Sequence, residues 1–233
     1  MKRMRQSPYE LASNLERKLV NLGVRFRDDG FPEFPKEMIL GSLPDDLDIL
    51  PFVHRRMAPS KSSTLICSFE NDADIYRRIA HLDDDIEQYR AYLGFCGFDL
   101  SARGGMDARL QKFNLLLNAM ANTYLAVSAG IPMLPNFRIG GIETLEVLSL
   151  YPKGSIFAAG TLGCARGNVD YNCAYLRTKS MYAQPSEIAV YGALREEYAR
   201  VLEEDSVSYR VVPDYRTRSY ARSRGEAPVT HGL

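Results

Sequence analysis

The sequence is poor in the residues that build metal sites and disulfide frameworks. It has 4 cysteines and 3 histidines among 233 residues, and no two cysteines form a C-x-x-C pair. Cys164 and Cys173 form a C-x8-C pattern, which matches no usual zinc site, so we expect no metal site. Cys164 follows a glycine-rich turn, but no histidine lies near a predicted strand end to act as its base, which disfavours a thiol nucleophile. So few cysteines favour reduced thiols in the cytoplasm.

Further absences narrow the classes of function. The 29 basic and 29 acidic residues give a net charge of zero. This argues against a protein whose whole surface binds nucleic acid or a membrane. No apolar run approaches the roughly 18 residues that cross a bilayer, and no apolar segment follows the basic N-terminus to form a signal peptide. A G-x-x-x-x-G-K-[ST] loop and a G-x-G-x-x-G fingerprint are both missing, so the common nucleotide-binding motifs are excluded. We expect a soluble protein without a membrane partner.

Short apolar segments alternate with helical patterns along most of the chain. The predicted strands are residues 63–69, 92–98, 131–135, 155–159, 187–191 and 207–212. The alternation predicts right-handed βαβ units and a mainly parallel sheet. The expected fold class is α/β, as a (β/α)-barrel-like or incomplete barrel, with an open doubly wound sheet as the alternative. The clear βα strands are too few for a full barrel, so segments 28–60 and 207–212 would have to supply the remainder.

Residues 1–212 are expected to form a single α/β domain. Its first helix begins at Ser7-Pro8-Tyr9-Glu10, a capping box with proline at the first helical position. Residues 28–60 are rich in proline and are predicted to wrap irregularly over the surface, with short extended pieces. Residues 213–233 are rich in arginine with little to bury, so we expect a flexible tail.

Polar residues follow the predicted strands at the points where these strands end. Ligands of parallel α/β proteins bind at this edge, because the βα loops converge there. The candidate residues are Glu70, Asp99, Ser101, Asn136, Arg138, Thr161 and Tyr191. We expect four of them to meet at one mouth of the sheet: Glu70, Asp99, Asn136 and Arg138. Plain loop chemistry is the alternative interpretation.

Each candidate has a proposed role and a structural alternative. Asp99 and Glu70 are the candidate catalytic residues, because two carboxylates in a cleft can act as acid and base. Asp99 follows an apolar strand, so its pKa is expected to be perturbed. Arg138 would bind a phosphate or carboxylate through its planar fork. The substrate-orienting residues would be Asn136, Ser101, Thr161 and Tyr191. Asp99 as a helix cap, or an Asp99–Arg138 salt bridge, is the alternative.

Three functions remain open at this stage, and no cofactor is identified. The first is an enzyme that acts on a phosphorylated or carboxylated small molecule or nucleotide. The second is a nucleic-acid-associated accessory protein that uses the tail arginines Arg216, Arg218, Arg222 and Arg224 to contact phosphates. The third is a non-catalytic protein that binds a protein partner. The oligomeric state is not predicted.

Three stretches of the chain carry a resemblance to a known family. They are Gly97-Phe98-Asp99-Leu100-Ser101, residues 130–138 and residues 154–164. On these stretches, residues 92–192 resemble the family of domains of unknown function numbered 4417, which is found in phages and mobile elements. The chain departs from the family pattern at Phe98 and Ile139, where proline and tryptophan are frequent. The resemblance implies a phage or prophage origin, and hence a bacterial host cell, but no activity. For the third function it implies a host or phage protein as the partner.

Overall fold

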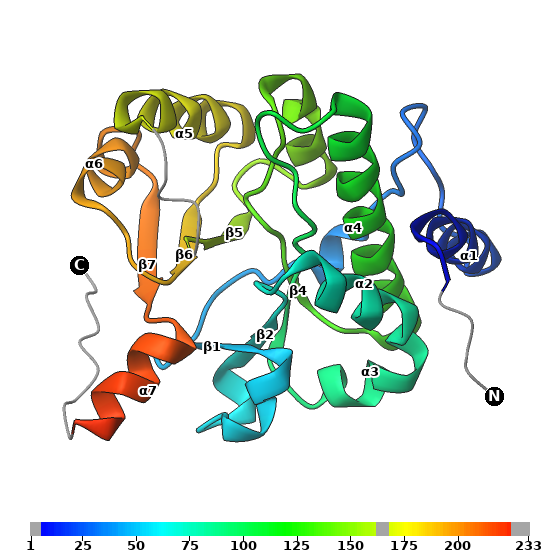
Figure 1. The fold of residues 1–233 in the computed structure, drawn as a ribbon, viewed down its shortest axis with the longest axis horizontal. Helices are drawn as coiled ribbons and strands as arrows, with labels where there is room; N and C mark the ends of the chain where they lie inside the picture. The colour runs from blue at the N-terminus through cyan, green and yellow to red at the C-terminus, as the bar shows by residue number, and fades with distance from the viewer. Residues whose placement is uncertain (1–5, 162–167, 225–233) are drawn as a thin grey trace.

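The computed structural model describes residues 6–161 and 168–224, which form an α/β fold with parallel strands (Figure 1). The strands are β1 (Asp48–Pro51), β2 (Thr64–Cys67), β3 (Gly94–Cys96), β4 (Met133–Leu134), β5 (Ile156–Gly160), β6 (Glu187–Tyr191) and β7 (Ser208–Val212). The α-helices are α1 (Pro8–Asn21), α2 (Asp72–Ala80), α3 (Leu82–Arg90), α4 (Ala108–Ala129), α5 (Val169–Ala183), α6 (Glu196–Glu204) and α7 (Tyr215–Ser223). Short 3-10 helices occupy Lys36–Met38, Phe52–Met57, Lys61–Ser63 and Ile142–Leu150.

The strands follow one another in space in the same order as in the sequence. One parallel sheet has the order β1-β2-β3-β4 and a second has the order β5-β6-β7. A parallel bridge between Asn136 and Ala158 joins them, with hydrogen bonds from Phe137 N to Ala158 O (2.7 Å) and from Ala158 N to Pro135 O (2.8 Å). The β-layer is therefore continuous from β1 to β7.

Side chains from every strand meet in one apolar interior. This cluster contains Ile49, Leu65, Cys67, Cys96, Leu134, Ile156, Ala158, Ala189, Tyr191 and Val212. A doubly wound sheet would reverse its strand order at a switch point and bury two separate faces, whereas consecutive parallel strands around a shared interior form a barrel. No ladder pairs β1 with β7 among the described strands. The predicted α/β class with parallel strands is confirmed, and the shared interior favours the incomplete (β/α) barrel over the open doubly wound sheet.

The segment 28–60 differs in part from its prediction as a surface wrap. Residues Asp48–Pro51 form β1, which pairs in parallel register with β2. Ile49 is fully buried in the barrel interior. These four residues are one of the short extended pieces expected in this segment, and they line the interior instead of the surface. Segment 28–60 supplies an additional strand, as an incomplete barrel requires.

Within the predicted tail, residues 215–223 are helix α7, whereas residues 225–233 lie outside the described part of the chain. Asp214 begins the helix: its Oδ1 accepts hydrogen bonds from Arg216 N (2.9 Å) and Thr217 N (3.1 Å). Arg218 then forms an ion pair with Asp48 and donates to Ile49 O (2.8 Å). Helix α7 thus connects the end of β7 to β1 across the open side of the barrel (Figure 1).

Helices cover the outside of the β-layer. The predicted capping box is present at the start of α1, where Ser7 N donates to Glu10 Oε2 (2.6 Å) and Glu10 N donates to Ser7 Oγ (3.2 Å). Helix α1 packs against α4, and α5 and α6 lie together beside the β5-β6-β7 sheet (Figure 1). Among the described helices, none combines the length and the apolar composition that crossing a membrane requires.

Candidate functional site

The loops after β3 and β4 bring two of the predicted site residues into contact. The Nε atom of Arg138 lies 3.3 Å from Oδ1 of Asp99. The Asp99 side chain is 15% exposed and the Arg138 side chain 23% exposed. Because all strands are parallel, both residues lie at the carboxyl edge of the barrel wall, where ligands of such folds bind.

The electrostatic surroundings of Asp99 shift its proton affinity. Burial raises the pKa of Asp99 to about 6, and the negative charge of Asp72 acts in the same direction. Arg138 and Lys179 oppose this change by lowering the pKa. Burial is the largest of these influences, so the carboxyl group exchanges its proton within the range where general acids and bases operate.

Lys179 is a residue of this site that the sequence analysis did not identify. It comes from α5, and its Nζ donates to Phe137 O (3.0 Å) and lies 4.4 Å from the centroid of the Phe137 ring. Lys179 has no strand-end position, so only the packing of α5 against the loop after β4 reveals it. Asp99 therefore lies in the field of two cations, Arg138 and Lys179.

Asn136 stands beside the pair, with only one of its polar atoms engaged. Its Nδ2 donates to Gly97 O (2.6 Å) and Phe98 O (3.0 Å). Its Oδ1 is buried and has no hydrogen-bond partner among the described residues. Only the Oδ1 atom of Asn136 is therefore available to a ligand, as a hydrogen-bond acceptor.

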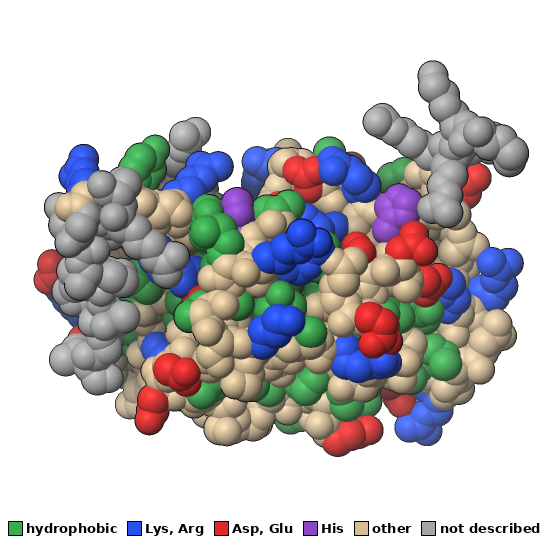
Figure 2. Space-filling view, turned by 90° about the horizontal axis from the view of Figure 1, so that it is seen from below, with side chains coloured by type: hydrophobic (Ala, Val, Ile, Leu, Met, Phe, Trp, Pro, Cys, Tyr) green, Lys and Arg blue, Asp and Glu red, His purple; other side chains and the backbone are tan. Residues whose placement is uncertain are grey.

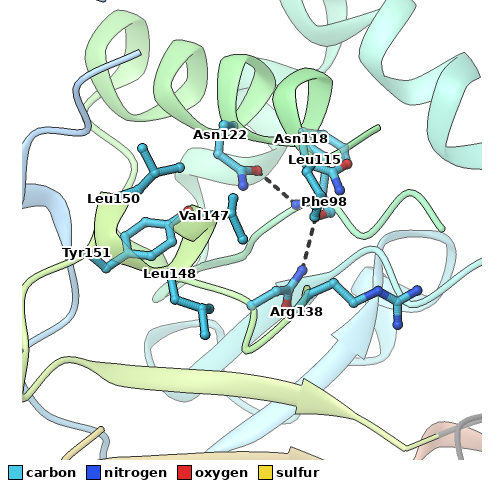
Figure 3. A pocket seen from close by; sticks show the side chains of 11 residues that line it. Phe98, Leu115, Asn118, Asn122, Arg138, Val147, Leu148, Leu150 and Tyr151 are labelled. Atoms are coloured by element: carbon cyan, nitrogen blue, oxygen red, sulfur yellow. Dashed lines mark hydrogen bonds between the residues drawn. The ribbon is translucent and has the colours of Figure 1, made fainter. Parts of the chain in front are cut away.

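A small cavity adjoins Asn136 (Figure 3). Its volume is about 30 Å³, enough for one or two water molecules. Asn118, Asn122 and Asn136 form a polar wall. The opposite wall is apolar and consists of Val147, Leu148, Leu150 and Tyr151. The Arg138 side chain extends away from this apolar wall (Figure 3).

Glu70, the second candidate catalytic residue, belongs to a different group of side chains. Its carboxylate accepts two hydrogen bonds from Arg78, at 2.9 Å from Nε and 3.1 Å from Nη2. The guanidinium of Arg78 lies 4.3 Å from the centroid of the Phe52 ring. The structure gives Glu70 a bidentate partner from α2, and no contact joins it to Asp99. Glu70 is thus engaged in an ion pair between β2 and α2.

The other predicted substrate contacts, Ser101, Thr161 and Tyr191, lie at the same edge and form hydrogen bonds within the fold. Ser101 accepts Asn114 Nδ2 at its carbonyl (2.7 Å) and donates its backbone N–H to Asp72 (2.9 Å). Thr161 Oγ1 donates to Tyr191 O (3.3 Å). Tyr191 is buried in the barrel interior, and its hydroxyl accepts from the backbone N–H that starts α7. These residues hold the edge of the barrel together.

No known family model matches this chain, and no curated protein or solved structure matches it either. The resemblance to the family numbered 4417 stays a prediction. The geometry of the site is therefore the basis of the functional argument.

The cysteines and acidic clusters do not form a second reactive centre in the described residues. Cys67 and Cys96 are free thiols inside the barrel, and burial raises the pKa of both. Cys173 is also free, whereas Cys164 lies outside the described residues. No group of three or more potential metal ligands occurs within residues 6–161 and 168–224. Of the run Asp83-Asp84-Asp85, Asp83 pairs with Lys18.

The tail arginines of the nucleic-acid alternative have different surroundings. Arg218 is engaged with Asp48, whereas Arg216 and Arg224 are exposed. The side chain of Arg222 lies outside the described part of the structure. Figure 2 shows basic and acidic side chains interspersed over one face of the molecule. Among the described residues of that face, no continuous basic surface of the kind that tracks a phosphate backbone is seen.

Proposed function

We propose that this chain is an enzyme that acts on a small molecule carrying a phosphate or carboxylate group. Asp99 would transfer a proton and Arg138 would bind the anionic group. The observation that carries the proposal is the half-buried Asp99 carboxyl, whose pKa is raised to about 6, in contact with Arg138 at the carboxyl edge of parallel strands.

The two roles support each other electrostatically. A carboxyl group with a pKa near neutrality exists in both protonation states, so it can give or take a proton during turnover. Arg138 now pairs partly with Asp99. An anionic ligand at Arg138 would weaken that pairing and add negative charge, and both changes raise the pKa of Asp99. Ligand binding would therefore favour the uptake of a proton by Asp99.

The test is a turnover screen of the full chain with three substrate classes: sugar phosphates, nucleotides and small dicarboxylates. Asp99→Asn should reduce turnover of an active substrate at least 100-fold, because general acid–base groups contribute about 10²–10⁴-fold. The variant should fold, with a melting temperature at pH 7 no lower than that of the wild type, because it lacks the buried charge. Glu70→Gln is the matched control, since this carboxylate is engaged with Arg78, and it should retain turnover wherever it folds.

Two results would contradict the proposal. One is an Asp99→Asn variant that keeps its turnover. The other is a large loss of stability in that variant, which would make Asp99 a structural residue.

The proposal includes a phage or prophage origin and a place in the cytoplasm of the bacterial host. The first part is supported by the resemblance of residues 92–192 to the family numbered 4417. The second is supported by the free thiols of Cys67, Cys96 and Cys173, which suit a reducing compartment.

A further inference from the structure

The loop that carries Asp99 is bonded by asparagines along its whole length. Asn122 Oδ1 accepts from Phe98 N (2.8 Å), and Asn118 Oδ1 accepts from Leu100 N (3.1 Å). Asn114 Nδ2 donates to Ser101 O (2.7 Å). The three asparagines are spaced four residues apart in α4, so they project from one face of the helix toward successive backbone groups. Figure 3 shows Asn122 and Asn118 on this face.

Asn136 binds the same loop from the other side. Both of its Nδ2 hydrogen bonds reach the loop, at Gly97 O and Phe98 O. A β-carbon built on Gly97 would lie 2.7 Å from Asn122 Nδ2, so no larger residue fits there without moving the amide. The backbone of residues 97–101 is thus enclosed between α4 and the loop after β4.

Burying these amides is energetically unfavourable unless they are bonded. Asn114, Asn118 and Asn122 are 3%, 6% and 3% exposed. Leucine in their place would pack more easily in a long buried helix, but it would leave the backbone groups of the loop unsatisfied. Buried and fully bonded polar networks fix one conformation of the groups they bind. A hydrophobic helix face would not fix the loop in this way.

We infer that Asn114, Asn118, Asn122 and Asn136, the loop-binding asparagines, are positioning residues that place Asp99 against Arg138. The amides touch neither the Asp99 carboxylate nor a reacting group; they act through the backbone on both sides of it. The catalytic meaning of this inference rests on the proposed function, whereas the positioning itself can be measured without any substrate.

The test is a ¹³C NMR titration of the Asp99 carboxyl in Asn118→Leu and in Asn122→Leu. Releasing the loop admits water to Asp99 and removes part of the burial that raises its pKa. The midpoint should therefore fall from about 6 by about one unit or more, toward the ~4 of a solvated aspartate. Thr123→Val is the matched control, because Thr123 is buried in the same helix and donates to Ala119 O (2.8 Å) within α4. It should leave the midpoint unchanged.

Unchanged midpoints in folded Asn118→Leu and Asn122→Leu variants would overturn the inference. If those variants fail to fold, the same titration is made in Asn136→Ala. This variant is better tolerated because Asn136 lies outside α4 and is only half-buried. An unchanged midpoint there would overturn the inference, and a shifted midpoint would support it. The proposed function fails separately: Asp99→Asn could keep its turnover even while the loop-binding asparagines control the titration of Asp99.

Discussion

The charge of Asp99 links protonation to the stability of the fold. Burial raises the pKa of Asp99 in the folded chain to about 6 from an ordinary value of 3.8. The folded state therefore binds the proton more tightly than the unfolded chain, and the free energy of unfolding falls as the pH rises from about 4 to 7. The loss over this range amounts to about 2 kcal/mol from this group alone.

Asp99→Asn removes this pH dependence. Relative to the wild type, its free energy of unfolding should increase by about 2 kcal/mol between pH 4 and pH 7. Urea denaturation of both proteins at several pH values measures the difference. Parallel curves over this range would show that Asp99 is solvated and not perturbed.

Glu70 shows the opposite case, a carboxylate fully engaged by a partner. Glu70→Gln keeps the shape but loses the charge-assisted hydrogen bonds to Arg78. We expect a loss of about 2 kcal/mol in the free energy of unfolding, as is usual for hydrogen bonds to charged groups. Denaturant midpoints at pH 7 test this, and a change within about 0.5 kcal/mol would mean that the ion pair contributes nothing.

Sequence reasoning found the Asp99–Arg138 contact because both residues follow predicted parallel strands, and such strand ends converge. It did not find the role of the α4 asparagines, although their four-residue spacing is visible in the sequence. That spacing predicts one helix face; it does not predict which backbone that face meets. Only the rotation of α4 about its axis, which packing determines, shows that the amides meet residues 97–101.

At the scale of elements, helix α7 provides the clearest energetic test. Arg218 and Asp48 form a largely buried ion pair, with side chains 13% and 6% exposed. Arg218→Met would leave the carboxylate of Asp48 buried without its cation, a loss of about 3–5 kcal/mol. Arg216→Met is the control, because Arg216 is exposed on the same helix. Guanidinium denaturation compares the two variants.

A double variant, Asp48→Asn with Arg218→Met, should recover part of that loss, because no charge then remains unpaired. Equal stabilities of Arg218→Met and Arg216→Met would show that α7 does not hold the open side of the barrel.

The elements that sequence reasoning missed share a physical cause. Strands β2 to β6 lie in mainly apolar segments, and β7 ends in two valines, so the sequence pattern predicts them. Strand β1 is short and lies between prolines and acidic residues, and α7 has few apolar side chains. The ion pair between Arg218 and Asp48 joins β1 to α7, so each element stabilises the other. Tertiary contacts of this kind override weak local propensity.

At the scale of the whole molecule, charge balance bears on the nucleic-acid alternative. The chain has no net charge, and its basic and acidic side chains are interspersed on the face in Figure 2. We expect any binding to single-stranded or duplex DNA to be no tighter than the non-specific range of about 10⁻⁴–10⁻⁶ M at physiological salt. Fluorescence anisotropy with labelled oligonucleotides measures this.

An Arg216→Ala/Arg224→Ala variant completes the experiment, since both side chains are exposed and the substitutions keep Arg218 in place. The two proteins should give the same curves. Nanomolar binding that these substitutions abolish would favour the nucleic-acid function instead.

The contact between Asp99 and Arg138 at the carboxyl edge of the barrel is most directly tested by titrating Asp99 in the wild type and in Arg138→Met. ¹³C NMR of the carboxyl group should give a midpoint near pH 6 in the wild type. The midpoint should be higher in the variant, because Arg138 lowers the pKa of Asp99. A wild-type midpoint near 4 that Arg138→Met does not move would contradict both the buried site and its acid–base role.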